Sequence, residues 1–417
     1  MRAGHVRDVQ ACHEPQRLCM AGAEEPFNIH CFGLAQSEMK IETKPRDMRL
    51  DAQRGCFLIL MAAVHVPTPV SHAVQEPLGY NGAAEGFVFL SACLAGLIYG
   101  RYYWQAGWPT MFQRVWRRVK RIYRVHLAVL LPTAVIAWAM AAKVPTLANH
   151  FADFLVHPLG SLVLIPLLLH QPPLFDILPM HVIFLGATPW LLALARRHGW
   201  KILLAVSAFG WFAAQFKLDA RLAGDPARLL PLRWGSFDIL AWQFLWICGV
   251  AVGETSLRRQ IIKPEFRILA GVPAMFVVLF GLLSRHGLWP QMWWNDDLFL
   301  WMDKWTLGPL RVLNFGAWAV LLLIWNPRLP RWLLAPTALL GRHSLAVFSF
   351  HLPLVIAATV LIESFAFSNA AQIFTGLLVI ALLFPWAACL DYNGRHADIP
   401  ANKLSRPVRA TCKTVRA

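Results

Sequence analysis

Charged side chains are scarce in this sequence: Asp, Glu, Lys and Arg make up 15% of its 417 residues, whereas hydrophobic residues make up 57%. Such a chain has too little polar surface to cover a water-soluble globule of this size. Many apolar runs reach the roughly 20 residues that an α-helix needs to cross a bilayer. The alternating segments of about 10 residues that build a membrane β-barrel are missing, so an all-α membrane protein is predicted.

Several catalytic and targeting motifs are also absent. The sequence has no Walker or GxGxxG phosphate loop, which leaves a kinase, an ATPase or a dehydrogenase without support. It has no GxSxG elbow, which argues against a serine nucleophile of the hydrolase type. Residues 1–45 lack the apolar core of a signal peptide. We interpret them as a disordered cytoplasmic segment or an over-extended start, with Met48 as the initiator in the second case.

Disulfides and metal sites are not expected either. On the topology derived below, none of the eight cysteines lies in an external loop, where oxidation would pair them. Cys12 and His13, together with His30 and Cys31, could be read as zinc ligands. Their spacing fits no standard zinc finger, so we predict no metal.

Ten apolar runs are long enough to span a membrane. One further stretch, Gly160–His170, is short and carries Pro166. We interpret it as a re-entrant or interfacial piece, and the count becomes eleven if it crosses. The ten predicted spans are 55–74, 83–100, 125–144, 176–195, 201–216, 237–254, 267–284, 307–325, 343–363 and 370–390.

The distribution of basic residues predicts the orientation. With the N-terminus inside, 31 of the 39 Lys and Arg residues fall in cytoplasmic segments, which satisfies the positive-inside rule. The predicted fold is therefore a polytopic transmembrane helical bundle of about ten helices with both termini in the cytoplasm. It consists of a membrane domain over 46–390 and a basic cytoplasmic tail over 391–417. Because the net charge of +16 arises from these loop clusters, nucleic acid is not a predicted partner.

Ionisable groups in the first span are candidates for chemistry, because burying them in lipid is costly. Arg54 lies at the cytoplasmic mouth, and His65 follows eleven residues later, about 16 Å deeper at 1.5 Å per residue. Eleven residues is close to three helical turns, so both project from nearly the same face, with Asp51 one turn earlier. A neutral imidazole can take a proton from a hydroxyl or be acylated itself. The alternative is a packed histidine bonded to a carbonyl.

Further candidates lie beyond the first span. Glu85 begins the second, antiparallel span and could orient the imidazole of His65; otherwise it is a glutamate in an external mouth. The basic segment 114–124 suits the phosphates of a cofactor such as coenzyme A, besides its role as a positive-inside signal. Arg311 would be stable in its span only with a partner. The candidate donor-binding or substrate-binding residues are Asp51, Ser91, Arg117, Arg118, Arg121, Asp176, Arg311 and His351.

The external loop after the seventh span is rich in indoles and carboxylates. Indole rings stack on sugar faces and carboxylates accept sugar hydroxyls, so this loop could bind a glycan. An aromatic belt at the membrane surface is an equally weighted alternative. The residues concerned are Trp289, Trp293, Trp294, Trp301, Trp305, Asp296, Asp297 and Asp303.

A family resemblance covers nearly all of the membrane portion. The segments RLDAQRG followed by His65, AAEGFVFLSA, FDILPMH, ILAWQFLWICG, LGPLRVLNFGA and GRHSLAVFSFHLPL occur in this order. From about Arg46 to Pro385 the chain resembles the OpgC-type membrane proteins, a branch of acyltransferase family 3. The family's arginine and histidine match Arg54 and His65, and its basic loop matches 117–124.

The resemblance implies an O-acyltransferase of the bacterial inner membrane. Such an enzyme moves an acyl group, succinyl in OpgC-type members, from cytoplasmic acyl-CoA to a hydroxyl of a periplasmic glucan. His65 would act as general base or transient acyl carrier, Glu85 would orient it, and Arg54 would anchor an anion. The implied partners are the glycan acceptor, acyl-CoA, the lipid bilayer and glucan-synthesis proteins.

Two alternatives remain beside the acyltransferase. The first is a transporter for an organic anion or a sugar, with Arg54, Arg311 and His65 as substrate and proton sites. Transporter folds typically contain internal repeats, and no convincing repeat relates the two halves of this sequence. The second is a catalytically inactive paralogue that only assembles with glucan-synthesis proteins.

Overall fold

The computed structural model describes residues 47–216, 235–256, 264–287, 300–325 and 330–397. The chain divides into two units, Met1–Glu42 and Thr43–Ala417, and the first lies outside the described residues. The paired Cys and His residues considered as zinc ligands therefore lie outside them too. Most of the predicted basic tail does as well, so the proposed domain boundaries stay predictions.

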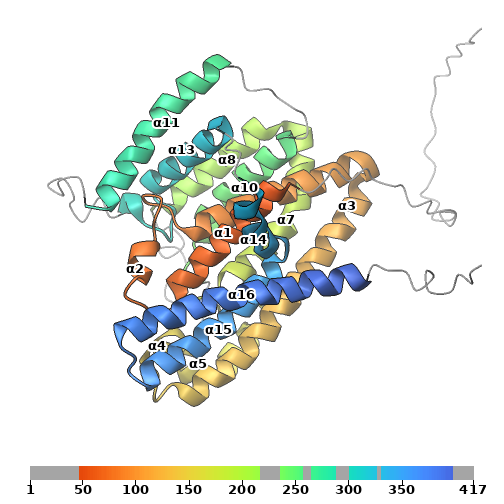
Figure 1. Ribbon diagram of the computed structural model, residues 1–417. Helices are drawn as coiled ribbons and strands as arrows, with labels where there is room; N and C mark the ends of the chain where they lie inside the picture. Colours follow the sequence, from red (N-terminus) through yellow and green to blue (C-terminus); the bar gives the residue numbers. More distant parts are fainter. Residues whose placement is uncertain (1–46, 217–234, 257–263, 288–299, 326–329, 398–417) are drawn as a thin grey trace, which may run out of the picture. The chain divides into compact units, whose positions relative to one another are not determined.

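Every regular element in the described part of the chain is a helix, as predicted (Figure 1). The helices are α1 (Met48–His65), α2 (Ser71–Val74), α3 (Ala83–Met140), α4 (Pro145–His150), α5 (Ala152–Val156), α6 (Pro158–Leu164), α7 (Ile177–His198), α8 (Trp200–Ala214), α10 (Ile239–Ser256), α11 (Pro264–Arg285), α13 (Pro309–Trp325), α14 (Arg331–Arg342), α15 (Ser344–Ser364) and α16 (Asn369–Ala397).

Six of the described helices are long and apolar enough to cross a membrane, namely α3, α7, α10, α11, α15 and α16. Two shorter apolar helices, α8 and α13, overlap further predicted spans. The stretch Gly160–His170 contains only the short helix α6 and irregular backbone. These findings support a polytopic helical membrane protein, whereas the count of ten and the orientation stay predictions.

The first predicted span, 55–74, was wrong at its outer end. Helix α1 stops at His65, and Val66 takes an extended conformation with φ −77° and ψ 126°. Val66 precedes Pro67, whose ring disfavours the helical conformation in the residue before it. His65 is consequently the last helical residue of α1.

Helix α3 joins two predicted spans, 83–100 and 125–144, through a sharp break. Gly107 has φ +76° and ψ 178° inside this element, a conformation that glycine adopts readily and other residues rarely do. Figure 1 shows the two arms of α3 running in different directions from this bend. The bend lies just before the basic segment 114–124, which therefore starts the second arm.

Large apolar side chains cover the outward faces of several helices. Phe209 of α8 is 73% exposed and Phe276 of α11 is 71% exposed. Apolar surface of this kind requires a nonaqueous partner, and α11 is one of the six membrane-length helices. Its outer face is therefore suited to lipid.

Helix α1 is held close to α14 in its N-terminal half by two glycines. A Cβ atom added at Gly55 would lie 1.9 Å from the carbonyl oxygen of Thr337, and one at Gly341 would lie 1.8 Å from that of Asp51. No side chain fits at either position, so the two backbones touch. This contact fixes the helix that carries Arg54 and His65.

Candidate functional site

The C-terminal end of α1 meets α15 through two histidines, which we call the histidine pair. Nδ1 of His65 lies 3.1 Å from Nε2 of His351. Their rings are stacked, with centroids 5.4 Å apart and planes inclined by 20°. His351 is 1% exposed, whereas His65 is only partly buried. The structure thus brings together two candidates that are 286 residues apart in the sequence.

Hydrogen bonding assigns the protons of the histidine pair. Nδ1 of His351 lies 2.5 Å from the carbonyl oxygen of Phe348. A carbonyl can only accept, so this nitrogen donates, and Nε2 of a neutral His351 carries a lone pair. Nδ1 of His65 must therefore donate to it. Nε2 of His65 is left with its own lone pair, as a base or a nucleophile requires.

Aromatic rings connect the histidine pair to Arg54. The guanidinium carbon of Arg54 lies 5.5 Å from the ring centre of Phe87, within the range of a cation–π interaction. Phe87 packs against Phe348 at 6.1 Å, and Phe348 against His351 at 4.8 Å. We call Phe87 and Phe348 the aromatic column. The aromatic column connects Arg54 to His351 and, through His351, to His65. The sequence places Arg54 and His65 on one face of α1.

Glu85 lies at the start of α3 and bonds to Arg311 rather than to an imidazole. Its Oε1 accepts a hydrogen bond from Nη1 of Arg311 at 2.8 Å, and its Oε2 accepts from the backbone N–H of Gly82 at 3.1 Å. Glu85 is fully buried, and Arg311 is 3% exposed. His351 therefore occupies the orienting position predicted for Glu85. The catalytic roles themselves stay predictions.

Arg311 has the partners that its position in a span requires. Besides Glu85, it pairs with Glu76, and its Nε and Nη2 donate to the carbonyl oxygen of Met302 at 3.1 and 3.0 Å. Arg285 adds a second cation, 2.7 Å from Glu76. We call these four charged residues the outer ion network. It ties α3, α11 and α13 to the loop after α2.

Like Arg285, Glu76 is a member of the outer ion network that sequence reasoning missed. Burial alone would raise the pKa of its carboxyl, but Arg311 and Arg285 outweigh burial and leave the pKa below its ordinary value. Glu76 therefore stays ionised at neutral pH. The only signal in the sequence is a lone carboxylate in a loop, which is common in any protein.

The family model described as OpgC protein matches residues 46–394. The matched residues include the histidine pair, the aromatic column and the outer ion network. The chain belongs to the OpgC family. No curated protein and no solved structure matches it.

The basic segment of this OpgC-family chain divides into two faces. Arg117 and Arg121 are exposed, and Arg117 donates to Gln113 at 3.1 Å. Arg118 is less exposed than these two side chains. The exposed arginines are accessible to a phosphate-bearing ligand, while Arg118 is partly buried.

Two of the remaining candidates, Asp51 and Asp176, are buried near helix ends, and the third, Ser91, is partly buried within α3. Asp51 is 3% exposed and lies against Gly341 of α14. Asp176 precedes α7, and its Oδ2 accepts a hydrogen bond of 2.9 Å from the backbone N–H of Ser236, which ties α7 to the segment before α10. The buried hydroxyl of Ser91 has no hydrogen-bond partner among the described residues. It is therefore able to bond to a ligand.

Only the last part of the indole-rich external loop falls within the described residues. Residues 288–299 lie outside them, including three of its tryptophans and two of its aspartates. Asp303 accepts hydrogen bonds from the backbone N–H and the hydroxyl of Thr306, at 3.1 and 2.7 Å. Trp301 and Trp305 are 51% and 44% exposed. The indoles are thus accessible, while the Asp303 carboxylate is already engaged within the loop.

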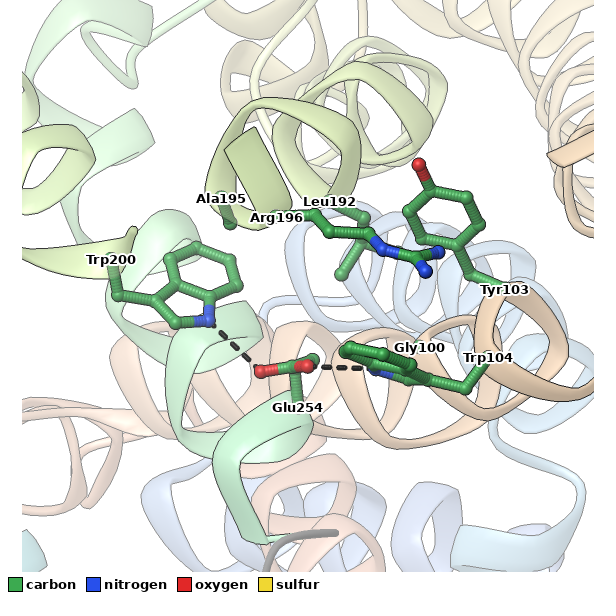
Figure 2. A pocket seen from close by; sticks show the side chains of 8 residues that line it. All are labelled: Gly100, Tyr103, Trp104, Leu192, Ala195, Arg196, Trp200 and Glu254. Atoms are coloured by element: carbon green, nitrogen blue, oxygen red, sulfur yellow. Dashed lines mark hydrogen bonds between the residues drawn. The ribbon is translucent and has the colours of Figure 1, made fainter. Parts of the chain in front are cut away.

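A second polar cluster lies where α3, α7, α8 and α10 meet, and Figure 2 shows it. Glu254 is 4% exposed and accepts hydrogen bonds from the indole N–H groups of Trp104 and Trp200, at 2.9 and 3.0 Å. Arg196 lies over the Trp104 ring at 4.5 Å. Sequence reasoning missed Glu254, which ends a long apolar run. Because its carboxylate already bonds to both indoles, we assign this cluster to helix packing.

Metal ligation finds no support in the part of the chain that the structure describes. No group of three or more His, Cys, Asp or Glu side chains there could hold a metal ion. The four described cysteines, Cys56, Cys93, Cys248 and Cys389, are free thiols.

Proposed function

We propose that this protein is a membrane O-acyltransferase that transfers an acyl group from cytoplasmic acyl-CoA to a hydroxyl of a periplasmic glucan or a related glycan. Membership of the OpgC family and the helical membrane architecture support this class of activity. The single observation that carries the mechanism is the histidine pair, because it leaves Nε2 of His65 with a lone pair in a side chain that is only partly buried.

In the direct mechanism, Nε2 of His65 acts as a general base. It takes the proton of the acceptor hydroxyl as the hydroxyl oxygen attacks the thioester carbonyl. The C–S bond of the tetrahedral intermediate breaks, and the coenzyme A thiolate takes the proton back from the imidazolium. His351 holds the ring and stabilises its positive charge through the hydrogen bond to Nδ1.

In the alternative mechanism, Nε2 of His65 is the nucleophile. It attacks the thioester carbonyl, coenzyme A leaves as the thiolate, and an acyl-imidazole remains on the protein. The glycan hydroxyl then attacks this acyl group and restores the imidazole. The same tautomer serves both mechanisms, so the geometry of the histidine pair is compatible with either.

The two substrates are proposed to arrive from opposite sides. The exposed arginines 117 and 121 would bind the phosphates of the donor at the cytoplasmic surface. The exposed indoles of Trp301 and Trp305 would contact the glycan on the other side. A succinyl group remains the proposed acyl group by family resemblance, and the bacterial inner membrane is the proposed location.

A transporter is less well supported by the charged residues. In that alternative Arg311 would bind an anionic substrate, but its guanidinium already pairs with Glu76 and Glu85 and bonds to Met302. Binding an external anion would require breaking this buried network, which is costly. The acyltransferase requires no such rearrangement of Arg311.

The direct test is the substitution pattern of glucans made by cells. Mass spectrometry of periplasmic glucans should detect acyl substituents with the wild-type allele and none with a deletion or a His65→Ala allele. Immunoblotting of membranes should show equal amounts of the two proteins. Identical glucan masses in all three strains would refute acyl transfer to this acceptor.

The orienting role of His351 predicts a graded response. His351→Leu should lower kcat by roughly 10- to 100-fold, because the wrong tautomer and ring position of His65 then become accessible. His351→Gln should retain more activity, since its side-chain oxygen can accept from Nδ1 of His65. The KM for acyl-CoA should stay nearly constant in both variants. A large rise in this KM at unchanged kcat would instead place His351 in donor binding.

A further inference from the structure

Another buried histidine, His181 of α7, has one nitrogen that the fold does not use. The side chain is 7% exposed, and its Nδ1 lies 2.7 Å from the carbonyl oxygen of Ile177. Because the carbonyl only accepts, Nδ1 donates, and Nε2 of the neutral ring carries the lone pair. Nε2 is fully buried and has no hydrogen-bond partner within the described part of the chain.

An unsatisfied buried acceptor of this kind is unusual in a folded protein. Water or a ligand normally provides the missing donor, because burying a polar atom without a partner is costly. The Nε2 atom of His181 requires an N–H or O–H group. A carboxylate or phosphate without a proton would not satisfy it.

His181 lies beside the aromatic column, at its Phe87 ring. Its ring centre is 5.6 Å from that of Phe87 and 5.5 Å from that of Trp246. Phe87 is the same ring that contacts Arg54 on one side and Phe348 on the other. His181 is therefore close to the line along which a molecule bound at the basic segment would reach His65.

The charges near His181 indicate from which side that molecule comes. Arg54 contacts the same Phe87 ring as His181, and Arg118 belongs to the basic segment that suits donor phosphates. Between its phosphates and its thioester, an acyl-CoA carries the pantetheine arm, whose two amide groups each offer an N–H. These amides are the donor groups that fit a lone acceptor on this route.

We propose that Nε2 of His181 accepts a hydrogen bond from an amide N–H of the pantetheine arm of the acyl donor. The inference rests on the proposed function and adds a donor-contacting residue to it. The arm then runs beside the aromatic column from Arg118 past Arg54, and its thioester reaches the histidine pair. Ser91, whose hydroxyl has no partner among the described residues, is not required for this contact.

Coenzyme A binding to the detergent-solubilised full chain tests the proposal by isothermal titration calorimetry. His181→Phe keeps the ring packed against Phe87 and Trp246 but removes Nε2, and should weaken coenzyme A binding roughly tenfold. His181→Gln places an acceptor oxygen near the position of Nε2, and should stay within about threefold of wild type. Adenosine 3′,5′-bisphosphate, which lacks the arm, should bind equally to all variants.

Thr188→Val is the matched control. Thr188 lies two turns along α7, is fully buried, donates to the carbonyl of Phe184 and accepts from the indole of Trp246. Its loss disturbs the same helix and the same Trp246 ring without removing an acceptor beside the aromatic column. Coenzyme A should bind this variant as it binds wild type.

Three results would overturn the inference. Equal coenzyme A affinity of wild type and His181→Phe would show that no arm amide bonds to His181, and would leave the acyltransferase proposal intact. An equal loss of adenosine 3′,5′-bisphosphate binding would show a general structural effect. A failure of the wild-type protein to bind coenzyme A would refute the proposed donor, and the inference with it.

Discussion

His65→Asn is expected to lower acyl transfer by at least about a thousandfold, within the range that positioned bases and nucleophiles contribute. The amide N–H of asparagine lies close to the position of Nδ1, so the variant can still donate to Nε2 of His351. It has no atom at the position of Nε2, which is the reactive atom in both proposed mechanisms. The measurement is the initial rate of transfer from acyl-CoA to purified glucan in liposomes.

His72→Asn provides the control for this experiment. His72 lies on the exposed surface of α2, in the loop that follows His65, and its replacement should leave the rate within about twofold of wild type. A His65→Asn rate above one tenth of wild type would contradict the central role of Nε2. The hydroxyl would then have to be activated by another group.

The same pair of proteins distinguishes the two mechanisms. Acyl-labelled coenzyme A is mixed with protein in the absence of glucan, and the reaction is quenched within a single turnover. Label retained on wild type and absent from His65→Asn would indicate an acyl-imidazole. Label retained on neither protein, with transfer restored when glucan is added, would indicate direct transfer with His65 as base.

Arg311→Met is expected to destabilise the fold by about 3–5 kcal/mol, the usual cost of removing one partner from a buried ion pair. The substitution leaves the fully buried Glu85 without a cation, and leaves Glu76 with Arg285 alone. It also removes both donors to the carbonyl of Met302. Thermal or denaturant unfolding of the solubilised protein measures the effect, and Glu85→Gln in the same background should recover part of it.

Arg285→Met is the matched control, because it removes the other cation beside Glu76. The side chain of Arg285 is 36% exposed, against 3% for Arg311, so water can replace much of its interaction and the loss should be below about 1 kcal/mol. Equal destabilisation by the two substitutions would contradict the view that burial makes Arg311 the central residue of the outer ion network.

Arg311 is expected to contribute mainly to the stability of the fold, and His65 mainly to the rate of acyl transfer. Arg311 holds α3 and α13 to Glu76, which also pairs with Arg285 of α11, whereas His65 contributes an atom that the fold does not use. Arg311→Met should therefore lower the amount of folded protein more than the rate per folded molecule. His65→Asn should do the opposite, since its hydrogen bond to His351 can be kept.

The sequence by itself determined the class of the protein and the candidate on α1. Scarce charge and long apolar runs predict membrane helices because the cost of burying polar groups in lipid acts on each segment separately. The spacing of Arg54 and His65 is likewise a local property. Eleven residues are about three turns of any α-helix, so the two side chains project from nearly the same face whatever the helix packs against. The need of Arg311 for a partner followed from its position in an apolar run, and the structure confirms it.

Only the tertiary structure decided which groups meet. The partner of His65 is His351, 286 residues away, and the partner of Glu85 is Arg311, 226 residues away. In the sequence, Glu85 and His351 are both polar residues in apolar runs, and either could have reached the imidazole. A hydrogen bond requires atoms within about 3 Å, and helix packing alone brings side chains so far apart in the chain to that distance.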